Sequence, residues 1–298
     1  MSQPHLRSTG DIAPTPRPGK VGIWSMELRF GDPSLIRESI AEIEQLGFSA
    51  VWIPGGIGGE LLLDLERLLD ASTQITVATG ILNIYKHEPA AVAAWLHSRS
   101  QEHQARLMLG LGVSHAPLIG ESYSKPLAAM GSYLDALDTA GVPPERRCLA
   151  ALGPQMLELA RRRSAGAHPY LVTPEHTAAA RAVLGPQALL APEQGVILET
   201  DATTARATAR RALVHYMHLP NYLNSWRRMG FAQEDVTQVT DRFVDGLFAW
   251  GTLEHIAARV QAHLAAGADQ VCLQVLHPQG AKMQPPREVW RTLASALL

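Results

Sequence analysis

Cysteine, net charge and long apolar runs are all scarce in this sequence, and each scarcity excludes a class of protein. The two cysteines, Cys148 and Cys272, are too few for a disulfide framework or a four-cysteine zinc site. Both lie in apolar runs, so we expect buried free thiols. The formal net charge of -2 provides no positive surface for nucleic acid or for an anionic membrane.

The sequence also lacks the segments that target a chain to a membrane. No stretch reaches the roughly 18 consecutive apolar residues that a membrane-spanning helix needs. Residues 1–20 hold four prolines and no apolar core of a secretory signal. We therefore expect a cytoplasmic protein without a membrane partner, with a flexible N-terminal arm over residues 1–19 and a single domain over residues 20–298.

Short apolar runs alternate along the chain with longer amphipathic segments. The runs are nearly continuous in apolar residues, which is typical of parallel strands buried on both faces. The segment 34–46 places its apolar side chains on one helical stripe, and 252–264 repeats that design. Eight candidate strands follow, at 21–26, 50–54, 75–82, 107–113, 148–153, 167–172, 195–198 and 270–276.

This alternation predicts an α/β fold, namely a (β/α)8 TIM barrel with helical insertions at the C-terminal mouth. A Rossmann fold is disfavoured, because no G-x-G-x-x-G follows the first run and no Walker A sequence occurs. The region 200–251 is too long for one crossover helix, so we interpret it as a helical insertion over the mouth. We interpret 121–142 as a second, shorter insertion.

In such a barrel the active site lies where the strands end. Four of seven strand ends carry glycine, which lets the backbone approach a flat or phosphorylated ligand closely. Ordinary turns also use glycine, but its repetition around the mouth favours a large ligand. The stretch from Gly153 to Met156 is typical of a helix start with Pro154 in its first turn, where free amides attract an anion such as phosphate.

The twelve histidines mostly lie on predicted helices, where a surface role explains them. His115 and His168 differ, because each follows a predicted strand and points toward the mouth, where histidine can supply a proton near neutral pH. A structural role remains open for both. The stretch from His87 to Pro89 is typical of a helix start. We predict no metal site, and the arginine clusters are explained by solvated helix faces.

Several segments, taken in order, resemble the bacterial luciferase-like monooxygenase superfamily and, within it, the coenzyme F420-dependent oxidoreductases. The resemblance extends from about residue 21 to residue 276. It rests on ITVATGILN (75–83), HEPAAV (87–92), RLMLGLGVSH (106–115), ALGPQML (151–157), AGAHPYLV (165–172), WGTLE (250–254) and AGAD (266–269).

The resemblance implies a deazaflavin or flavin ring lying across the barrel mouth, and a homodimer. It also implies a bulge after the third strand, with a non-proline cis peptide between Gly80 and Ile81 supporting one face of the ring. The turn at Gly153, Pro154 and Met156 would hold the cofactor phosphate. The other strand ends supply the remaining candidate cofactor contacts, which are Pro54, Gly55, Asn83, Gly112, Val113, His168 and Tyr170.

The sequence departs from related sugar-phosphate dehydrogenases at two places. Those enzymes carry an acidic residue and a histidine at the end of strand two, where this chain has Pro54, Gly55 and Gly56. They also place a glutamate just after strand four, where this chain has His115. The proton relay at strand two is therefore missing, and a different substrate is expected.

The function that we expect is an F420-dependent oxidoreductase that moves a hydride between the deazaflavin and a small organic substrate. His115 is the candidate for proton transfer, and Trp24 with Glu27 would wall the substrate side. Three alternatives stay open. They are an FMN-dependent monooxygenase that uses molecular oxygen, a non-catalytic flavin-binding protein on the same barrel, and a metal-dependent barrel hydrolase that uses scattered histidines.

Overall fold

The computed structural model describes residues 19–56, 58–123, 125–280 and 283–298. The expected N-terminal arm, residues 1–19, lies outside the described residues except for Gly19. None of the helices within these ranges has both the length and the apolar character that crossing a bilayer requires.

Parallel strands form the centre of the molecule, and almost every residue in them is buried. Neighbouring strands align residue by residue, as when Val21 pairs with Val271 and Val51 with Val77. The strands are β1 (Val21–Trp24), β2 (Ala50–Ile53), β3 (Thr76–Thr79), β5 (Leu107–Gly112), β6 (Arg147–Leu149), β7 (Gly166–Ala167), β8 (Leu189–Leu190), β9 (Glu193–Ile197) and β11 (Val271–Val275). The predicted strands all fall on or beside these segments.

The sheet closes on itself through one bent strand. β8 and β9 are separated only by Ala191 and Pro192. There the Ala191 N–H donates to the Ala167 carbonyl at 2.9 Å, and the Cys272 N–H donates to the Pro192 carbonyl at 2.9 Å. β8 therefore pairs with β7 on one side, while β9 pairs with β11, which pairs with β1. The predicted TIM-barrel fold is confirmed.

Besides β8, two short strands were not predicted as strands of their own, because a two- or three-residue segment leaves no periodic signal. β4 (Leu82–Asn83) pairs with β5, and β10 (Phe248–Trp250) pairs with β9. Both extend the sheet at the ends where strands β3 and β9 reach the mouth.

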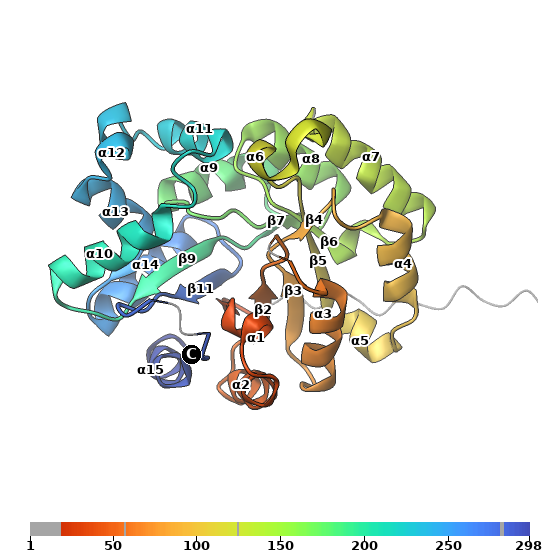
Figure 1. The fold of residues 1–298 in the computed structure, drawn as a ribbon, viewed down its shortest axis with the longest axis horizontal. Coiled ribbons are helices and arrows are strands. Elements are labelled where there is room, and N and C mark those ends of the chain that lie inside the picture. The colour runs from red at the N-terminus through yellow and green to blue at the C-terminus, as the bar shows by residue number, and fades with distance from the viewer. Residues whose placement is uncertain (1–18, 57, 124, 281–282) are drawn as a thin grey trace, which may run out of the picture.

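Helices surround the sheet, as Figure 1 shows. The predicted helix at 34–46 is α2, which begins where the Asp32 carboxylate accepts the N–H groups of Ser34 and Leu35 and buries Ile40 and Ile43. The surrounding helices are α2 (Pro33–Gln45), α3 (Leu61–Asp70), α4 (Pro89–His97), α5 (Gln101–Arg106), α7 (Pro126–Thr139), α8 (Pro154–Arg163), α9 (Pro174–Leu184), α14 (Leu253–Ala265) and α15 (Arg287–Leu297). Short helical turns occur at α1 (Glu27–Phe30) and η2 (Pro144–Arg146).

Side chains fill the barrel interior. Trp52, Met108, Cys148 and Cys272 pack there together with small residues. Both cysteines are buried free thiols, as predicted, and burial raises the pKa of each. They are therefore structural and not reactive.

The region 200–251 forms four helices with an apolar core of their own. Trp226 and Phe243 lie at the centre of this core, with ring centroids 4.9 Å apart. The helices group together at one side of the molecule (Figure 1). They are α10 (Ala202–Leu213), α11 (Pro220–Arg228), α12 (Gln233–Gln238) and α13 (Asp241–Leu247).

The region 121–142 differs from the second insertion that we expected. Most of it is α7, which packs between α4 and α8 in the surrounding ring of helices. It thus provides the crossover between β5 and β6 that any parallel barrel needs. Only α6 (Ala116–Ile119) and η1 (Gly120–Ser122) are added before it.

Candidate active site

A bulge follows β3 and reaches the barrel mouth. The peptide bond between Gly80 and Ile81 is cis, as expected from the resemblance. Both residues are half-buried. A Cβ atom on Gly55 would lie 2.4 Å from the Ile81 carbonyl oxygen, and one on Gly112 would lie 2.4 Å from the Ile81 Cδ1. Glycine at 55 and 112 therefore leaves room for the bulge, and the structure brings these four predicted residues together.

Asn83 and Val113 lie just beyond the bulge. Asn83 is buried, and its Oδ1 accepts the Tyr85 N–H at 3.0 Å. The Asn83 Nδ2 has no hydrogen-bond partner among the described residues. Val113 is half-buried and packs against the main apolar core.

Trp24 and His168 pack beneath the bulge. The Trp24 indole donates to the Gly80 carbonyl at 3.2 Å. The His168 ring stacks on Trp52 with centroids 4.1 Å apart, and its Nδ1 donates to the Ala191 carbonyl at 2.6 Å. Burial lowers the pKa of His168 to about 4, so the ring is neutral near pH 7 and its Nε2 is an acceptor. That nitrogen has no partner among the described residues.

An aromatic wall, which we define as Trp24, Tyr170, Tyr216, Tyr222 and Trp226, runs from Trp24 beneath the bulge to Trp226 of the insertion. The Tyr170 hydroxyl donates to the Gln274 Oε1 at 2.7 Å and accepts from the Tyr216 hydroxyl at 3.2 Å. The ring of Tyr170 lies 5.6 Å from that of Trp24 and 6.4 Å from that of Tyr222. Trp24 and Tyr170 are residues predicted from the sequence. The three aromatics of the insertion are not, although their clustering within residues 216–226 is a signal.

A buried acid holds the loop that carries Tyr170. The Glu193 Oε2 accepts the Leu171 N–H at 3.1 Å, and the Trp226 indole donates to the Leu171 carbonyl at 3.3 Å. The Glu193 Oε1 has no partner in the described chain. Burial raises the pKa of Glu193 to about 8, so the side chain is neutral near pH 7. Sequence analysis missed this residue, although a lone acid inside a buried strand is a recognisable signal.

His115 lies beneath the inserted helix α11. Its Nδ1 lies 3.1 Å from the Asn221 Oδ1, which can only accept, so Nδ1 carries the proton and Nε2 is the acceptor. Burial lowers the pKa of His115, the hydrogen bond to Asn221 opposes that shift, and the charge of His218 adds to it. The structure therefore presents a neutral imidazole whose tautomer is set by the insertion.

The start of α8 combines free amides with a cation. Gly153 is its N-cap and Pro154 follows in the first turn, as predicted. The Arg228 Nη2 donates to the Leu152 carbonyl at 3.3 Å and lies 3.5 Å from where a Gly153 Cβ would be. Met156 is half-buried against the core. Arg228 comes from α11, and sequence analysis had assigned it to a solvated surface.

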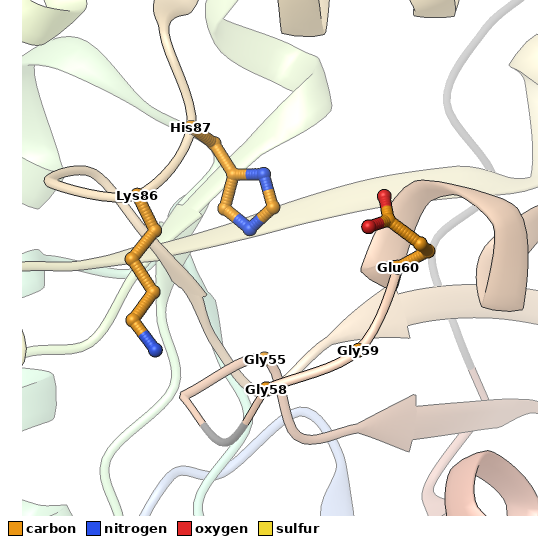
Figure 2. Close-up of a pocket in the computed structure, with 6 residues that line it drawn as sticks. All are labelled: Gly55, Gly58, Gly59, Glu60, Lys86 and His87. Carbon is orange, nitrogen blue, oxygen red and sulfur yellow. The ribbon is translucent and has the colours of Figure 1, made fainter.

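A cavity of about 360 Å³ opens beside the bulge. It is lined by Gly55, Gly58, Gly59, Glu60, Lys86 and His87, as Figure 2 shows, and we call it the rim cavity. Sequence analysis assigned residues 87–89 to a helix start. That is confirmed, because α4 begins at Pro89, but the structure also places His87 in the cavity wall.

Two predicted site residues, Glu27 and Pro54, form hydrogen bonds within the protein. Glu27 is buried and accepts a hydrogen bond from the Ser25 Oγ at 2.7 Å. The Pro54 carbonyl accepts from the Arg29 Nη1 at 2.5 Å. Within the described ranges, no group of three or more His, Cys, Asp or Glu side chains is arranged to bind a metal ion.

No protein-family model matches the chain, and no curated protein matches its sequence. Solved structures do resemble it. An F420-dependent secondary alcohol dehydrogenase in complex with an F420–acetone adduct aligns over 94% of this chain and 99% of its own, with 15% identity and a TM-score of 0.71. The coenzyme F420-dependent tetrahydromethanopterin reductase from Methanopyrus kandleri aligns over 94% and 97%, with 15% identity and a TM-score of 0.70.

A flavin enzyme is also similar to this chain. The type II Baeyer–Villiger monooxygenase from the CAM plasmid of Pseudomonas putida, the oxygenating constituent of 3,6-diketocamphane monooxygenase in complex with FMN, aligns over 94% and 97%. Its identity is 12% and its TM-score is 0.65. These likenesses show that the chain shares its barrel fold with F420-dependent enzymes and with a monooxygenase that contains FMN.

Proposed function

We propose that the chain is an F420-dependent oxidoreductase that acts on a small organic substrate. The observation that carries the proposal is the half-buried bulge at Gly80 and Ile81, for which glycine at positions 55 and 112 leaves room. A flat ring system could lie against such a partly exposed stretch of backbone. The similar solved structures, two of which are F420-dependent by name, support this assignment.

The residues around the mouth fit such a cofactor at both of its ends. The ring would lie against Gly80 and Ile81. The phosphate would lie at the start of α8, where Gly153 leaves the first amides open and Arg228 adds a positive charge. The buried, unpartnered Nδ2 of Asn83 is a donor that a ligand carbonyl could satisfy. When bound, a deazaflavin supplies hydride donor and acceptor chemistry.

The chain supplies proton transfer and exclusion of water. The neutral His115 can take a proton from a substrate hydroxyl at its Nε2, because Asn221 holds the proton on Nδ1. Trp24 and the rest of the aromatic wall present apolar surface at the mouth, which would keep water from the reacting atoms. Glu27 stays a predicted part of the substrate wall through its position beside Trp24.

Titration of the purified protein with F420 and, separately, with FMN tests the proposal. We expect F420 binding at least about tenfold tighter than FMN binding, which corresponds to about 1.4 kcal/mol. Tighter FMN binding with oxygen consumption would favour the monooxygenase alternative. Tight F420 binding without turnover of any tested alcohol, aldehyde or acid would favour the non-catalytic one. Binding of neither cofactor would overturn the proposal.

A pair of glycine variants checks where the ring binds. Gly112→Ala places a methyl group against Ile81 and should abolish F420 binding. Gly131→Ala, in α7, meets open space and is the matched control, which should bind F420 normally. Circular dichroism of both variants separates loss of binding from loss of fold. A folded Gly112→Ala variant with normal affinity would move the cofactor away from the bulge.

A further inference from the structure

The rim cavity has a floor that an internal ion pair holds in place. The Arg29 side chain is 1% exposed and pairs with Asp64 at 2.9 Å. Its two terminal nitrogens donate to the carbonyls of Pro54 at 2.5 Å and Gly58 at 2.7 Å. The loop after β2 is therefore anchored from inside the protein. These two hydrogen bonds fix the carbonyls of Pro54 and Gly58, which flank the cavity residues.

This anchoring leaves amide groups available. In a trans peptide the carbonyl and the following N–H point in opposite directions. Because the carbonyls of Pro54 and Gly58 face Arg29, the N–H groups of Gly55 and Gly59 face away from it. Neither N–H has an acceptor among the described residues, and both residues line the cavity. Unpaired backbone amides in a concave site are donors suited to an anion.

The opposite wall adds a cation and a further donor. The Lys86 Nζ donates to the Gly56 carbonyl at 3.3 Å. His87 is half-buried, and burial together with the charges of Arg29 and Lys86 lowers its pKa. The ring is thus neutral and can donate one hydrogen bond. Its backbone is fixed, because the Tyr133 hydroxyl donates to the His87 carbonyl at 2.9 Å.

One acid faces these groups. Figure 2 shows Glu60 and Lys86 on opposite sides of the cavity, with the His87 ring between them. Glu60 is exposed, so water screens its charge. Of the donors, Gly55, Lys86 and His87 lie away from Glu60, whereas Gly59 adjoins it, so Glu60 limits how strongly the cavity attracts an anion.

We propose that the rim cavity binds an oxyanion group of the substrate, either a carboxylate or a phosphate. The reaction assigned to the substrate rests on the proposed function. The position of the anion site does not depend on the proposed function, because Gly55 lines the cavity and also contacts Ile81 of the bulge. A molecule with its acid group on Lys86 would extend its other end toward the bulge. The substrate class is therefore a small organic acid or a phosphorylated small molecule.

Lysine labelling of the full chain without cofactor tests this proposal directly. The chain has four lysines, at positions 20, 86, 125 and 282. We would measure the rate at which an amine-reactive ester modifies each lysine, by mass spectrometry, with inorganic phosphate, succinate or chloride at constant ionic strength. Phosphate or succinate should slow labelling of Lys86 at least threefold and leave Lys20 unchanged. Chloride should protect neither.

Comparing succinate with phosphate shows whether the acid group of the substrate is a carboxylate or a phosphate. Protection by succinate alone indicates a carboxylic acid substrate, and protection by phosphate alone indicates a phosphorylated one. Equal labelling of Lys86 under all three conditions would overturn the proposal. Because phosphate also fits the start of α8, the measurement is made at Lys86 and repeated with Arg228→Gln, which should not alter protection of Lys86.

Charge variants provide a second readout by calorimetric titration of the protective anion. Lys86→Met should weaken binding at least tenfold. Glu60→Gln removes a like charge and should strengthen it about threefold. Lys20→Met, at the other end of β1, is the matched control and should change nothing. Weaker binding in Glu60→Gln would contradict the proposal, because it would make Glu60 part of the recognition.

F420 titration of the same variants separates the two proposals. Lys86→Met should bind F420 as the unmodified chain does. If Lys86 is protected by an anion but F420 does not bind, the anion site stands and the proposed function fails. If F420 binds normally and no anion protects Lys86, the anion site fails alone.

Discussion

The two sides of the barrel mouth are built in opposite ways. The side after β2 and β4, which holds the rim cavity, is formed by glycines and charged side chains that reach solvent. The side after β7 is the aromatic wall, where Tyr170, Tyr222 and Trp226 pack ring against ring and where the side chains of Tyr170 and Trp226 form internal hydrogen bonds. Under the proposed function, the tightly packed aromatic wall would orient the reacting groups, and the solvent-open rim cavity would select the substrate.

The two sides also differ in whether a buried ionisable side chain is charged or neutral. Arg29 keeps its charge because Asp64 lies 2.9 Å away. Glu193 has no cation nearby in the described chain, and burial instead keeps it protonated. Solvation explains both cases, since a buried charge needs a partner and a group without one becomes neutral. The glycine side should therefore respond to salt and the aromatic side to pH.

The largest effect is expected from removing the centre of the aromatic side. Trp226 is fully buried between Tyr222 and Phe243. Trp226→Ala should lower the free energy of unfolding by about 3–5 kcal/mol. Urea denaturation measures this. Lys86→Met, on the open side, should change stability by less than about 0.5 kcal/mol. Similar losses in the free energy of unfolding for both variants would show that the two sides of the mouth do not differ in their contribution to stability.

The second-largest effect is expected from removing His115, the candidate for proton transfer. His115→Ala should lower kcat about 100-fold, the scale of general acid–base catalysis, and leave F420 affinity nearly intact. Asn221→Ala should cost less in kcat, and it should shift the pH profile because the tautomer is no longer fixed. Steady-state kinetics across pH, with a separate cofactor titration, measure both. Unchanged turnover in His115→Ala would exclude the residue from the mechanism.

Glu193 predicts a pH dependence of stability. Its pKa is raised from 4.5 to about 8, so the folded chain keeps a proton that the unfolded chain loses. The stability that this proton confers is complete below pH 4.5 and is lost as the pH rises to about 8. Glu193→Gln should flatten this part of the stability curve. Glu193→Ala should cost about 1–3 kcal/mol, because the Leu171 N–H loses its acceptor.

Urea titrations at several pH values check this prediction. The Gln variant can still accept the Leu171 N–H, so it separates the lost proton from the lost hydrogen bond. A slope in Glu193→Gln equal to that of the unmodified chain would assign the pH dependence to another group.

The smallest predicted effect lies at the start of α8. Arg228→Gln should weaken F420 binding roughly tenfold and reduce its dependence on salt, because one charge-assisted contact is lost. Arg227→Gln is the matched control, since Arg227 is exposed and bonds to the Gln233 Oε1 at 2.8 Å. Equal losses in both variants would point to general electrostatic attraction instead of a defined phosphate contact.

Much of the fold could be predicted from the sequence because burial leaves a local signature. Strands buried on both faces are continuous apolar runs, and α2 buries one stripe. The closure of the barrel could not be predicted from the sequence. It depends on Ala191 and Pro192, which join two short strands that have different neighbours. The place of α7 was also misjudged, because the length of a segment does not show which helices it packs between.

The site was predictable only where a single segment defines it. The bulge at Gly80 and the helix start at Gly153 are local, and both were expected. The partner of His115 is Asn221, 106 residues away, and Arg228 reaches Leu152 across 76 residues. Such pairs have no sequence signal in one chain. The acids and bases of the rim cavity were missed for the same reason.

The bent strand determines where we expect the barrel to open locally. Pro192 has no N–H, and at this point the chain exchanges one neighbouring strand for another. The amides of Leu189, Ala191 and Glu193 all donate to the β7 side, so they share one seam. Hydrogen exchange should release these protons as a group, ahead of the amides of β1 and β2. The barrel would then open along a single line while the rest of its circumference stays intact.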